Sequence, residues 1–155
     1  MTENMKALTI WQPWASLVMA GWKPYEFRRW DYRTRYPDQE GKRIVIHAGA
    51  RYVRPDEVRD LIRRLEREDG AGTALDREAL PALRHLLRDV RTSLTACGLG
   101  TVMLGTPRRC TDLFRGPVAD SDRIDEHMWA WPMQEPRPFD DPVPRRGAQG
   151  FWKWE

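Results

Sequence analysis

Residues 6–28, KALTIWQPWASLVMAGWKPYEFR, form the most informative stretch of the chain. The first five, 6–10, combine a lysine with apolar and β-branched residues and predict a short strand. Pro13 suits the first turn of a helix, where its missing N–H leaves no hydrogen bond unmade. A glycine follows the apolar run, at the position where glycine commonly ends a helix, so we expect a helix over about 13–20. The aromatic and charged residues 25–30 then predict a second strand.

The rest of the chain predicts strands on both sides of a helical middle. Residues 43–48, RIVIHA, are apolar and β-branched and predict a compact strand. Apolar residues three and four apart predict a helix over 55–68 and another from 76 or 81 to about 95. Further strands are expected over 100–104 and onward to 113, over 127–133 until the prolines of 136–144, and over 151–154. The expected connections are a loop at 38–41, an acidic loop or helical turn at 120–122 and a tight turn at 147–150.

Length and composition narrow the class of protein. The 155 residues are 41% hydrophobic and 32% charged, which supports one domain with a buried core and argues against full disorder. No apolar run approaches a membrane span, and the N-terminus lacks the apolar stretch of a signal peptide. We therefore expect a cytoplasmic protein with no membrane partner. Cys97 and Cys110 make neither a disulfide framework nor a zinc set, so we expect no metal site and no cofactor.

The tryptophans and the charge both divide the chain. Eight tryptophans lie in two groups: Trp11, Trp14, Trp22 and Trp30 near the start, and Trp129, Trp131, Trp152 and Trp154 near the end. This split predicts that the two ends build one body, with a helical insertion over about 54–95. Residues 1–53 hold nine Lys and Arg against five Asp and Glu, which favours a polyanionic partner. The order of elements predicts an α+β fold, a small β-barrel with flanking short helices and an inserted helical hairpin.

Two segments near the start resemble a known family. Residues 8–17, LTIWQPWASL, and 21–28, GWKPYEFR, are similar to the opening motif of ASCH domains. In that motif a strand is followed by Gln-Pro, a small-residue helix and then Gly-x-Lys-x-x-Glu-x-Arg. Residues 41–49, GKRIVIHAG, resemble the second conserved strand of the family, and residues 147–154, GAQGFWKW, resemble its closing segment. The matches lie at both ends and leave 54–95 as a family-variable region.

The resemblance implies a single PUA-like β-barrel domain over 1–155, with a cleft that faces nucleic acid or a nucleotide. Members are associated with RNA or DNA binding, and some are ribonucleases. One branch contains small acetylcytidine amidohydrolases, which use a lysine, a threonine three residues later and a glutamate. The lysine corresponds to Lys23, but the threonine position holds Glu26 and the glutamate has no matching position here. The sequence therefore departs from the amidohydrolase branch.

Side-chain chemistry adds candidates around this motif. Gln12 carries both a donor and an acceptor, which suits a base edge, although it could instead cap the following helix. Lys23 could bind a phosphate or base, or act as a nucleophile if burial favours its neutral form. Glu26 would hold that lysine charged, which favours binding over catalysis, and an ordinary surface ion pair is the alternative. Arg28 could clamp a phosphate or form a salt bridge with Glu26.

Further candidates lie outside the motif. His47 could be a general acid or base, or a structural hydrogen-bonding residue. Arg145 could follow a phosphate backbone, and Gln149 lies between glycines that permit close approach of a ligand. Trp14, Trp152 and Ser16 complete the set, because one of the two tryptophans could stack on a base. We read Trp129 and Trp131 as core residues.

These observations favour a nucleic-acid-binding module whose cleft accepts a nucleotide or base, with single-stranded or modified RNA, or a nucleoside, as partner. The competing hypothesis is a hydrolase acting on RNA or modified nucleosides, with Lys23 and Glu26 as catalytic residues. A third hypothesis is a protein-interaction domain that docks a partner on the 54–95 hairpin.

Overall fold

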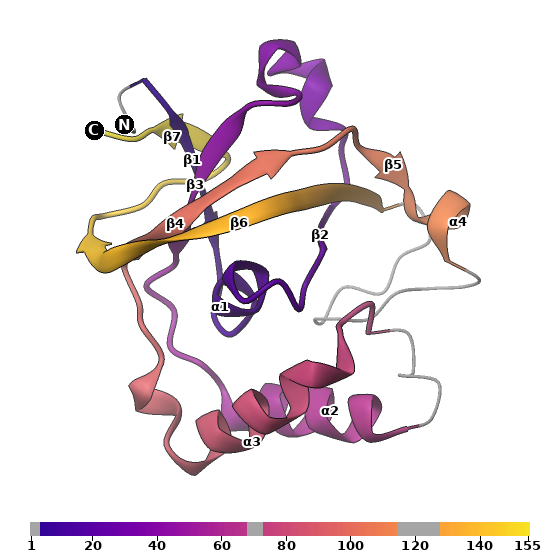
Figure 1. Cartoon of the computed structure of the whole chain (residues 1–155), viewed down its shortest axis with the longest axis vertical. Helices are drawn as coiled ribbons and strands as arrows, with labels where there is room; N and C mark the ends of the chain where they lie inside the picture. The colour runs from indigo at the N-terminus through magenta and orange to yellow at the C-terminus, as the bar shows by residue number, and fades with distance from the viewer. Residues whose placement is uncertain (1–3, 68–72, 115–127) are drawn as a thin grey trace.

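The computed structural model describes residues 4–67, 73–114 and 128–155. It is an α+β fold in which a curled, mixed sheet forms a half-barrel (Figure 1). The strands are β1 (Lys6–Ile10), β2 (Tyr25–Arg28), β3 (Arg43–Ala48), β4 (Cys97–Leu104), β5 (Arg108–Arg109), β6 (Trp129–Pro144) and β7 (Phe151–Lys153). Their order is β2-β6-β4-β3-β1-β7, and the two-residue β5 pairs with the start of β6. β1 and β3 run parallel, while the other pairs are antiparallel.

The two ends of the chain meet in this sheet. β1 lies between β3, where Thr9 is opposite His47, and β7, where Leu8 is opposite Phe151. Figure 1 shows the N- and C-termini close together beside these strands. The first and last strands, which carry or adjoin the two groups of tryptophans, therefore share one sheet.

Short helices lie around the half-barrel (Figure 1). The α-helices are α1 (Trp14–Met19), α2 (Pro55–Glu66), α3 (Leu80–Arg88) and α4 (Cys110–Leu113), and the 3-10 turns are η1 (Tyr32–Thr34), η2 (Pro37–Gln39), η4 (Arg77–Ala79) and η5 (Val90–Thr92). On the side that is lower in Figure 1, α1 packs on β3, β4 and β6, and α2 and α3 pair with each other beyond it. None of the helices in the described ranges has the length and apolar character needed to cross a bilayer.

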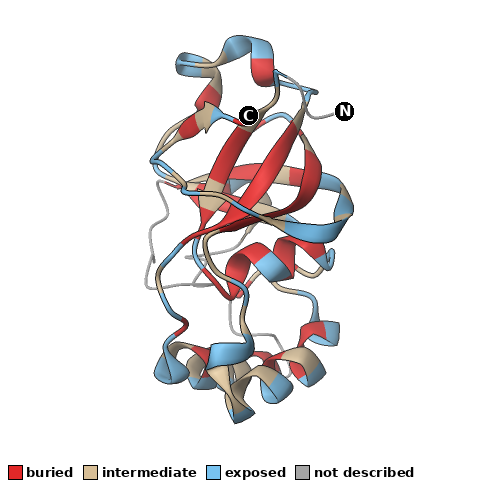
Figure 2. Cartoon of the chain, turned by 90° about the vertical axis from the view of Figure 1, so that its left-hand side faces the viewer, coloured by how far each residue is buried: buried red, intermediate tan, exposed pale blue. Residues whose placement is uncertain are grey.

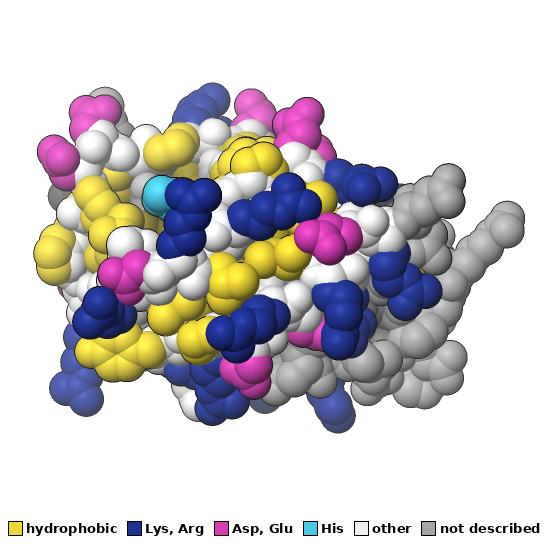
Figure 3. Space-filling model, turned by 90° about the horizontal axis from the view of Figure 1, so that it is seen from below, with side chains coloured by type: hydrophobic (Ala, Val, Ile, Leu, Met, Phe, Trp, Pro, Cys, Tyr) yellow, Lys and Arg dark blue, Asp and Glu magenta, His cyan; other side chains and the backbone are white. Residues whose placement is uncertain are grey.

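The hairpin of α2 and α3 is joined to the sheet by a continuous core. Leu61 and Leu83 from the hairpin belong to the same buried cluster as Ile46, Trp131 and Phe151 from the sheet. β3 and β4 are largely buried, whereas the outer faces of the hairpin are exposed (Figure 2). On the face seen from below, Lys and Arg alternate with Asp, Glu and hydrophobic side chains (Figure 3). The charges of the hairpin thus lie on solvated faces, as the helical pattern predicts.

Local patterns place several elements correctly. The strand over 43–48 has its predicted bounds, and α1, α2 and β7 each lie within the predicted range. β2 ends two residues before the predicted end at Trp30, and η2 occupies part of the loop expected at 38–41. The expected elements at 120–122 and at His127 lie outside the described residues.

The prediction that prolines end the strand after residue 133 is wrong. β6 continues through them to Pro144 and pairs with β4 over this stretch, with register shifts on both sides of Gly100–Thr101. β2 and β5 contact only its first residues, 129–132, so β6 beyond them has one described neighbour. Proline is tolerated where one side of a strand makes no ladder bonds and at irregularities, and both conditions hold here.

Two other predicted elements are also interrupted. The second hairpin helix ends at Arg88 instead of about 95, because Asp89 accepts a hydrogen bond from the backbone N–H of Arg91 and begins the separate turn η5. The strand expected to reach 113 ends at Leu104, and only the two residues of β5 pair with β6 again before α4 begins. The chain then forms β5 and α4, whose first residue donates to the Met128 carbonyl.

Candidate functional site

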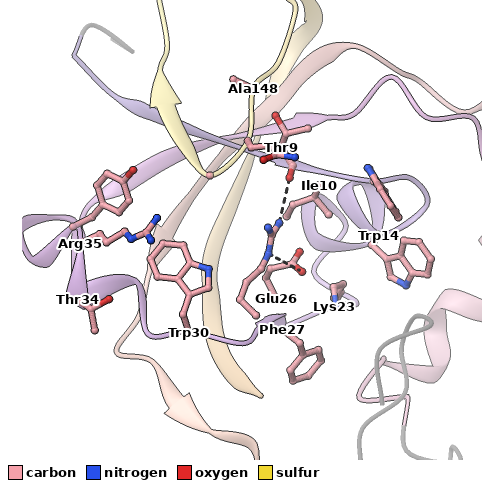
Figure 4. A pocket seen from close by; sticks show the side chains of 15 residues that line it. Thr9, Ile10, Trp14, Lys23, Glu26, Phe27, Trp30, Thr34, Arg35 and Ala148 are labelled. Atoms are coloured by element: carbon pink, nitrogen blue, oxygen red, sulfur yellow. Dashed lines mark hydrogen bonds and ion pairs between the residues drawn. The ribbon is translucent and has the colours of Figure 1, made fainter. Parts of the chain in front are cut away.

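An open cavity of about 620 Å³ lies beside α1, where the ends of β1 and β2 meet the loop before β7 (Figure 4). Its volume is within the range of small-molecule sites. Four segments supply its walls: Thr9–Trp11 with Trp14, Lys23 with Glu26–Arg28 and Trp30, Thr34–Tyr36, and Ala148–Gly150. We call it the first cavity.

Charged side chains are buried at the first cavity. Lys23 is 2% exposed and Glu26 is 8% exposed, although both types are rarely buried without a partner. The ammonium of Lys23 lies 4.8 Å from the centre of the Phe27 ring. A cation on a ring face is stabilised by the ring quadrupole, so this contact favours the charged form of the lysine.

Glu26 and Arg28 project from the same side of β2 because side chains two residues apart in a strand share a face. The Nε atom of Arg28 lies 3.6 Å from Oε1 of Glu26, and its Nη2 donates to the Thr9 carbonyl at 3.2 Å. Arg28 therefore links β2 to β1 at the cavity. The second carboxylate oxygen, Oε2 of Glu26, is enclosed and meets no hydrogen-bond donor among the described residues. It is an acceptor that a bound molecule can satisfy.

Aromatic rings and Arg35 complete the walls, and Arg51 lies behind one of the rings. Trp11 is 46% exposed, and the Arg51 guanidinium lies 4.1 Å from its ring centre. Arg35 lies 5.5 Å from the ring centre of Trp30, which also contacts Tyr36. None of these five residues was among the sequence candidates. The available signal was the basic and aromatic composition of 28–36, but sequence gave no way to separate wall residues from core residues.

A second cavity, of about 710 Å³, adjoins the first. The two share Thr9, Trp11, Ala148 and Gln149, so one wall separates them. The other residues around the second cavity are His47, Gly49, Ala50, Ala96 and Pro144–Gly147.

His47 belongs to a hydrogen-bonded chain that holds the loop before β7. The Trp152 indole N–H donates to the Thr9 hydroxyl at 3.0 Å, which lies 3.1 Å from Nδ1 of His47. Nε2 of His47 lies 2.6 Å from the Arg145 carbonyl. A carbonyl only accepts, so Nε2 carries the proton and Nδ1 accepts from the Thr9 hydroxyl.

Burial lowers the pKa of His47, and the bond to the Arg145 carbonyl opposes that effect only in part. The neutral ring is therefore favoured. His47 and Trp152 position the 145–147 backbone, which agrees with the structural alternative for this histidine.

Gln12 and Ser16 form a helix cap. Oε1 of Gln12 accepts the Ser16 backbone N–H at 2.9 Å, and its amide nitrogen donates to the Ser16 hydroxyl at 2.7 Å and to the Leu94 carbonyl at 2.9 Å. Gln12 is fully buried, and both amide hydrogens are used. The side-chain amide of Gln12 is therefore used within the protein and does not offer these groups to a base edge. Instead, the glutamine links α1 to the segment after η5.

The two cavities bring together most of the candidates. Trp14, Lys23, Glu26, Arg28 and Gln149 line the first, and His47, Arg145 and Gln149 line the second. Gln12, Ser16 and Trp152 are not among the described lining residues. In the described ranges, no three His, Cys, Asp or Glu side chains gather in a way that could hold a metal ion.

Comparison with known proteins adds no family to this geometry. Neither a scan against protein-family models nor a search of curated proteins found a match to the chain.

Proposed function

We propose that the chain is a PUA-like module of the ASCH type that binds nucleic acid, single-stranded or modified RNA in particular, and accepts one base in the first cavity. The observation that carries the proposal is the enclosed Oε2 of Glu26, which meets no donor in the described part of the chain, in a cavity that Lys23 also lines. Resemblance of residues 8–28 to the ASCH opening motif supports the same reading, because Lys23, Glu26 and Arg28 are motif positions.

The chemistry of a nucleobase fits these two groups. The pairing edge of a base offers hydrogen-bond donors and acceptors side by side. A carboxylate only accepts and an ammonium only donates, so Glu26 can take a base N–H while Lys23 donates to a ring nitrogen or carbonyl. An extruded or unpaired base can reach such a pocket, whereas a base inside a duplex cannot.

The walls of the cavity fit a base for a second reason. Trp14, Trp30 and Tyr36 supply aromatic surface, and stacking of one base on such a surface contributes about 1–3 kcal/mol. Arg28 and Arg35 add positive charge at the same cavity, which favours the phosphates that accompany a base.

Binding of oligonucleotides to matched variants tests the proposal. Tryptophan fluorescence titration with single-stranded RNA and DNA should show at least tenfold weaker binding for Lys23→Ala and Arg28→Ala. Arg84→Ala is the control, because Arg84 is an exposed hairpin arginine paired with Glu66, and its affinity should change less than twofold. Affinity of the native protein should fall as salt rises. Equal losses in all three variants would show that charge alone, and not the cavity, binds the strand.

A hydrolase remains the second candidate because the same cavity holds a buried amine and a buried carboxylate, Lys23 and Glu26. The amidohydrolase branch has threonine at the position of Glu26, and an ionised carboxylate cannot donate as a hydroxyl does. We therefore expect weak turnover of acetylcytidine.

Assays of the native chain, Lys23→Ala and Glu26→Thr separate the two functions. Robust native turnover that Lys23→Ala abolishes would establish the hydrolase. A gain of turnover in Glu26→Thr would show that the cavity retains the amidase geometry and lacks one group.

A further inference from the structure

The second cavity has a charge distribution suited to an anion. Arg145 and Arg146 line it, and none of its described lining residues is Asp or Glu. His47, the other titratable group on its wall, favours the neutral form for the reason given above. The cavity therefore presents positive charge without a built-in counterion.

Arg145 is held in place from several directions. Its backbone N–H donates to the Ala96 carbonyl at 3.0 Å, and its own carbonyl accepts from His47. The guanidinium lies 4.7 Å from the ring centre of Trp154. Its Nη1 atom is enclosed and meets no acceptor among the described residues. A fixed guanidinium with an unsatisfied N–H is well suited to phosphate oxygens.

The loop that follows is pressed against the sheet. A Cβ atom at Gly147 would lie 2.6 Å from the Thr9 hydroxyl and 2.7 Å from Cε1 of His47, so only glycine fits there without a shift. This close approach leads the chain to Gln149, which lines both cavities. Arg145 and the first cavity are thus linked by one anchored segment of five residues, 145–149.

We propose that the second cavity binds the phosphate attached to the nucleotide whose base occupies the first cavity, with Arg145 as the phosphate ligand. The proposal rests on the function proposed above and specifies its ligand: a phosphorylated nucleotide or a strand of at least two nucleotides, and not a free nucleoside. Trp11 and Gln149 line both cavities, so in this proposal they lie between the base and its phosphate.

Calorimetric titrations can separate the two cavities. The probes are the four ribonucleosides, their 5′- and 3′-monophosphates, the corresponding dinucleotides and inorganic phosphate. The native protein should bind either the 5′- or the 3′-monophosphate, or the dinucleotide, at least fivefold more tightly than the nucleoside. Arg145→Gln should remove that gain and leave nucleoside affinity within twofold, while Arg84→Gln, on the hairpin, should retain it.

The outcomes distinguish this proposal from the one it rests on. Equal binding of nucleosides and phosphorylated probes, or a gain that persists in Arg145→Gln, would overturn the phosphate site and leave the base site standing. No binding of any probe would overturn both. Nucleoside affinity also reports whether Arg145→Gln is folded. If this variant does not fold, Arg145→Lys replaces it. Unchanged preference of Arg145→Lys for phosphorylated probes, despite loss of the planar guanidinium, would count against the proposal.

Discussion

Two arginines beside the cavities, Arg35 and Arg145, have partners of a different kind from those of three arginines on the helical hairpin. On the hairpin, Arg63 and Arg64 pair with Asp60, and Arg84 pairs with Glu66. Around the cavities, Arg35 lies over Trp30 and Arg145 over Trp154. Neither of these two has a carboxylate within 4.0 Å among the described residues.

The difference follows from how each region is built. Residues three or four apart are neighbours on a helix, so its own sequence supplies counterions. At the cavities, Trp30 and Trp154 supply aromatic rings to these two arginines, and a ring holds the guanidinium without neutralising it. Arg35 and Arg145 are thus left available to an anion, whereas Arg28, at the first cavity, is paired with Glu26. Substitutions in both regions test this contrast, and the largest effect is expected in the buried aromatic cluster around Trp131.

Loss of the central tryptophan should have the largest effect. Trp131 is fully buried, contacts the rings of Trp30, Tyr32 and Phe151, and donates its indole N–H to the Trp30 carbonyl. Trp131→Ala should lower the free energy of unfolding by about 3–5 kcal/mol, as measured by urea denaturation. A loss below about 1 kcal/mol would show that the framework does not depend on this ring.

A methyl group at Gly147 should disturb the loop between the cavities. Gly147→Ala should cost about 1–3 kcal/mol of unfolding free energy, because the added carbon meets Thr9 and His47. Ala148→Ser, at the next and exposed position, is the control and should stay within about 0.5 kcal/mol. Similar losses in both variants would mean that the loop is not closely fitted to the sheet.

Acid should weaken the anchor of the same loop. Burial lowers the folded-state pKa of His47 below its usual 6.5, so below that pH the unfolded chain binds more protons than the folded chain. The stability contributed by the neutral ring is complete above pH 6.5 and is lost as the pH falls toward the folded pKa.

Melting temperatures between pH 8 and pH 5 measure this effect. His47→Gln should be less stable than the native protein at pH 8, and its melting temperature should fall less on acidification. Parallel curves for the two proteins would contradict the assignment.

The hairpin should give the smallest effect. Arg84 and Glu66 form an ion pair in which both side chains are about half exposed, 54% and 50%. Because solvent screens such pairs, Arg84→Ala should change the free energy of unfolding by less than about 0.5 kcal/mol. A loss above about 1 kcal/mol in urea denaturation would show that the hairpin also depends on its charges.

Much of the fold follows from local patterns in the sequence. The bounds of β3 and the extent of α2 come from apolar spacing alone, since each element buries one face or both. The placement of Glu26 and Arg28 on one face could also be predicted, because they are two residues apart on one strand. In this case the alternation of side chains along a strand agrees with the contact between the two residues in the structure.

The remaining features depend on distant partners. Gln12 could equally read a base or cap a helix, and the Leu94 carbonyl, 82 positions away, decides for the cap. Trp11 lines both cavities together with Ala148 and Gln149, which belong to a loop near the other end of the chain. The prolines of β6 were read as a stop because the sequence does not reveal that this part of the strand has one neighbour.

Those prolines also affect how the protein meets other copies of itself. An exposed strand edge is a template for aggregation, because a second chain can hydrogen-bond to its free N–H and C=O groups. Along the outer part of β6, Pro136, Pro138, Pro142 and Pro144 have no N–H to offer an incoming strand. The other strand at this margin, β2, has four residues, and β7 at the opposite margin has three. The half-barrel is thereby protected at these margins against intermolecular strand addition.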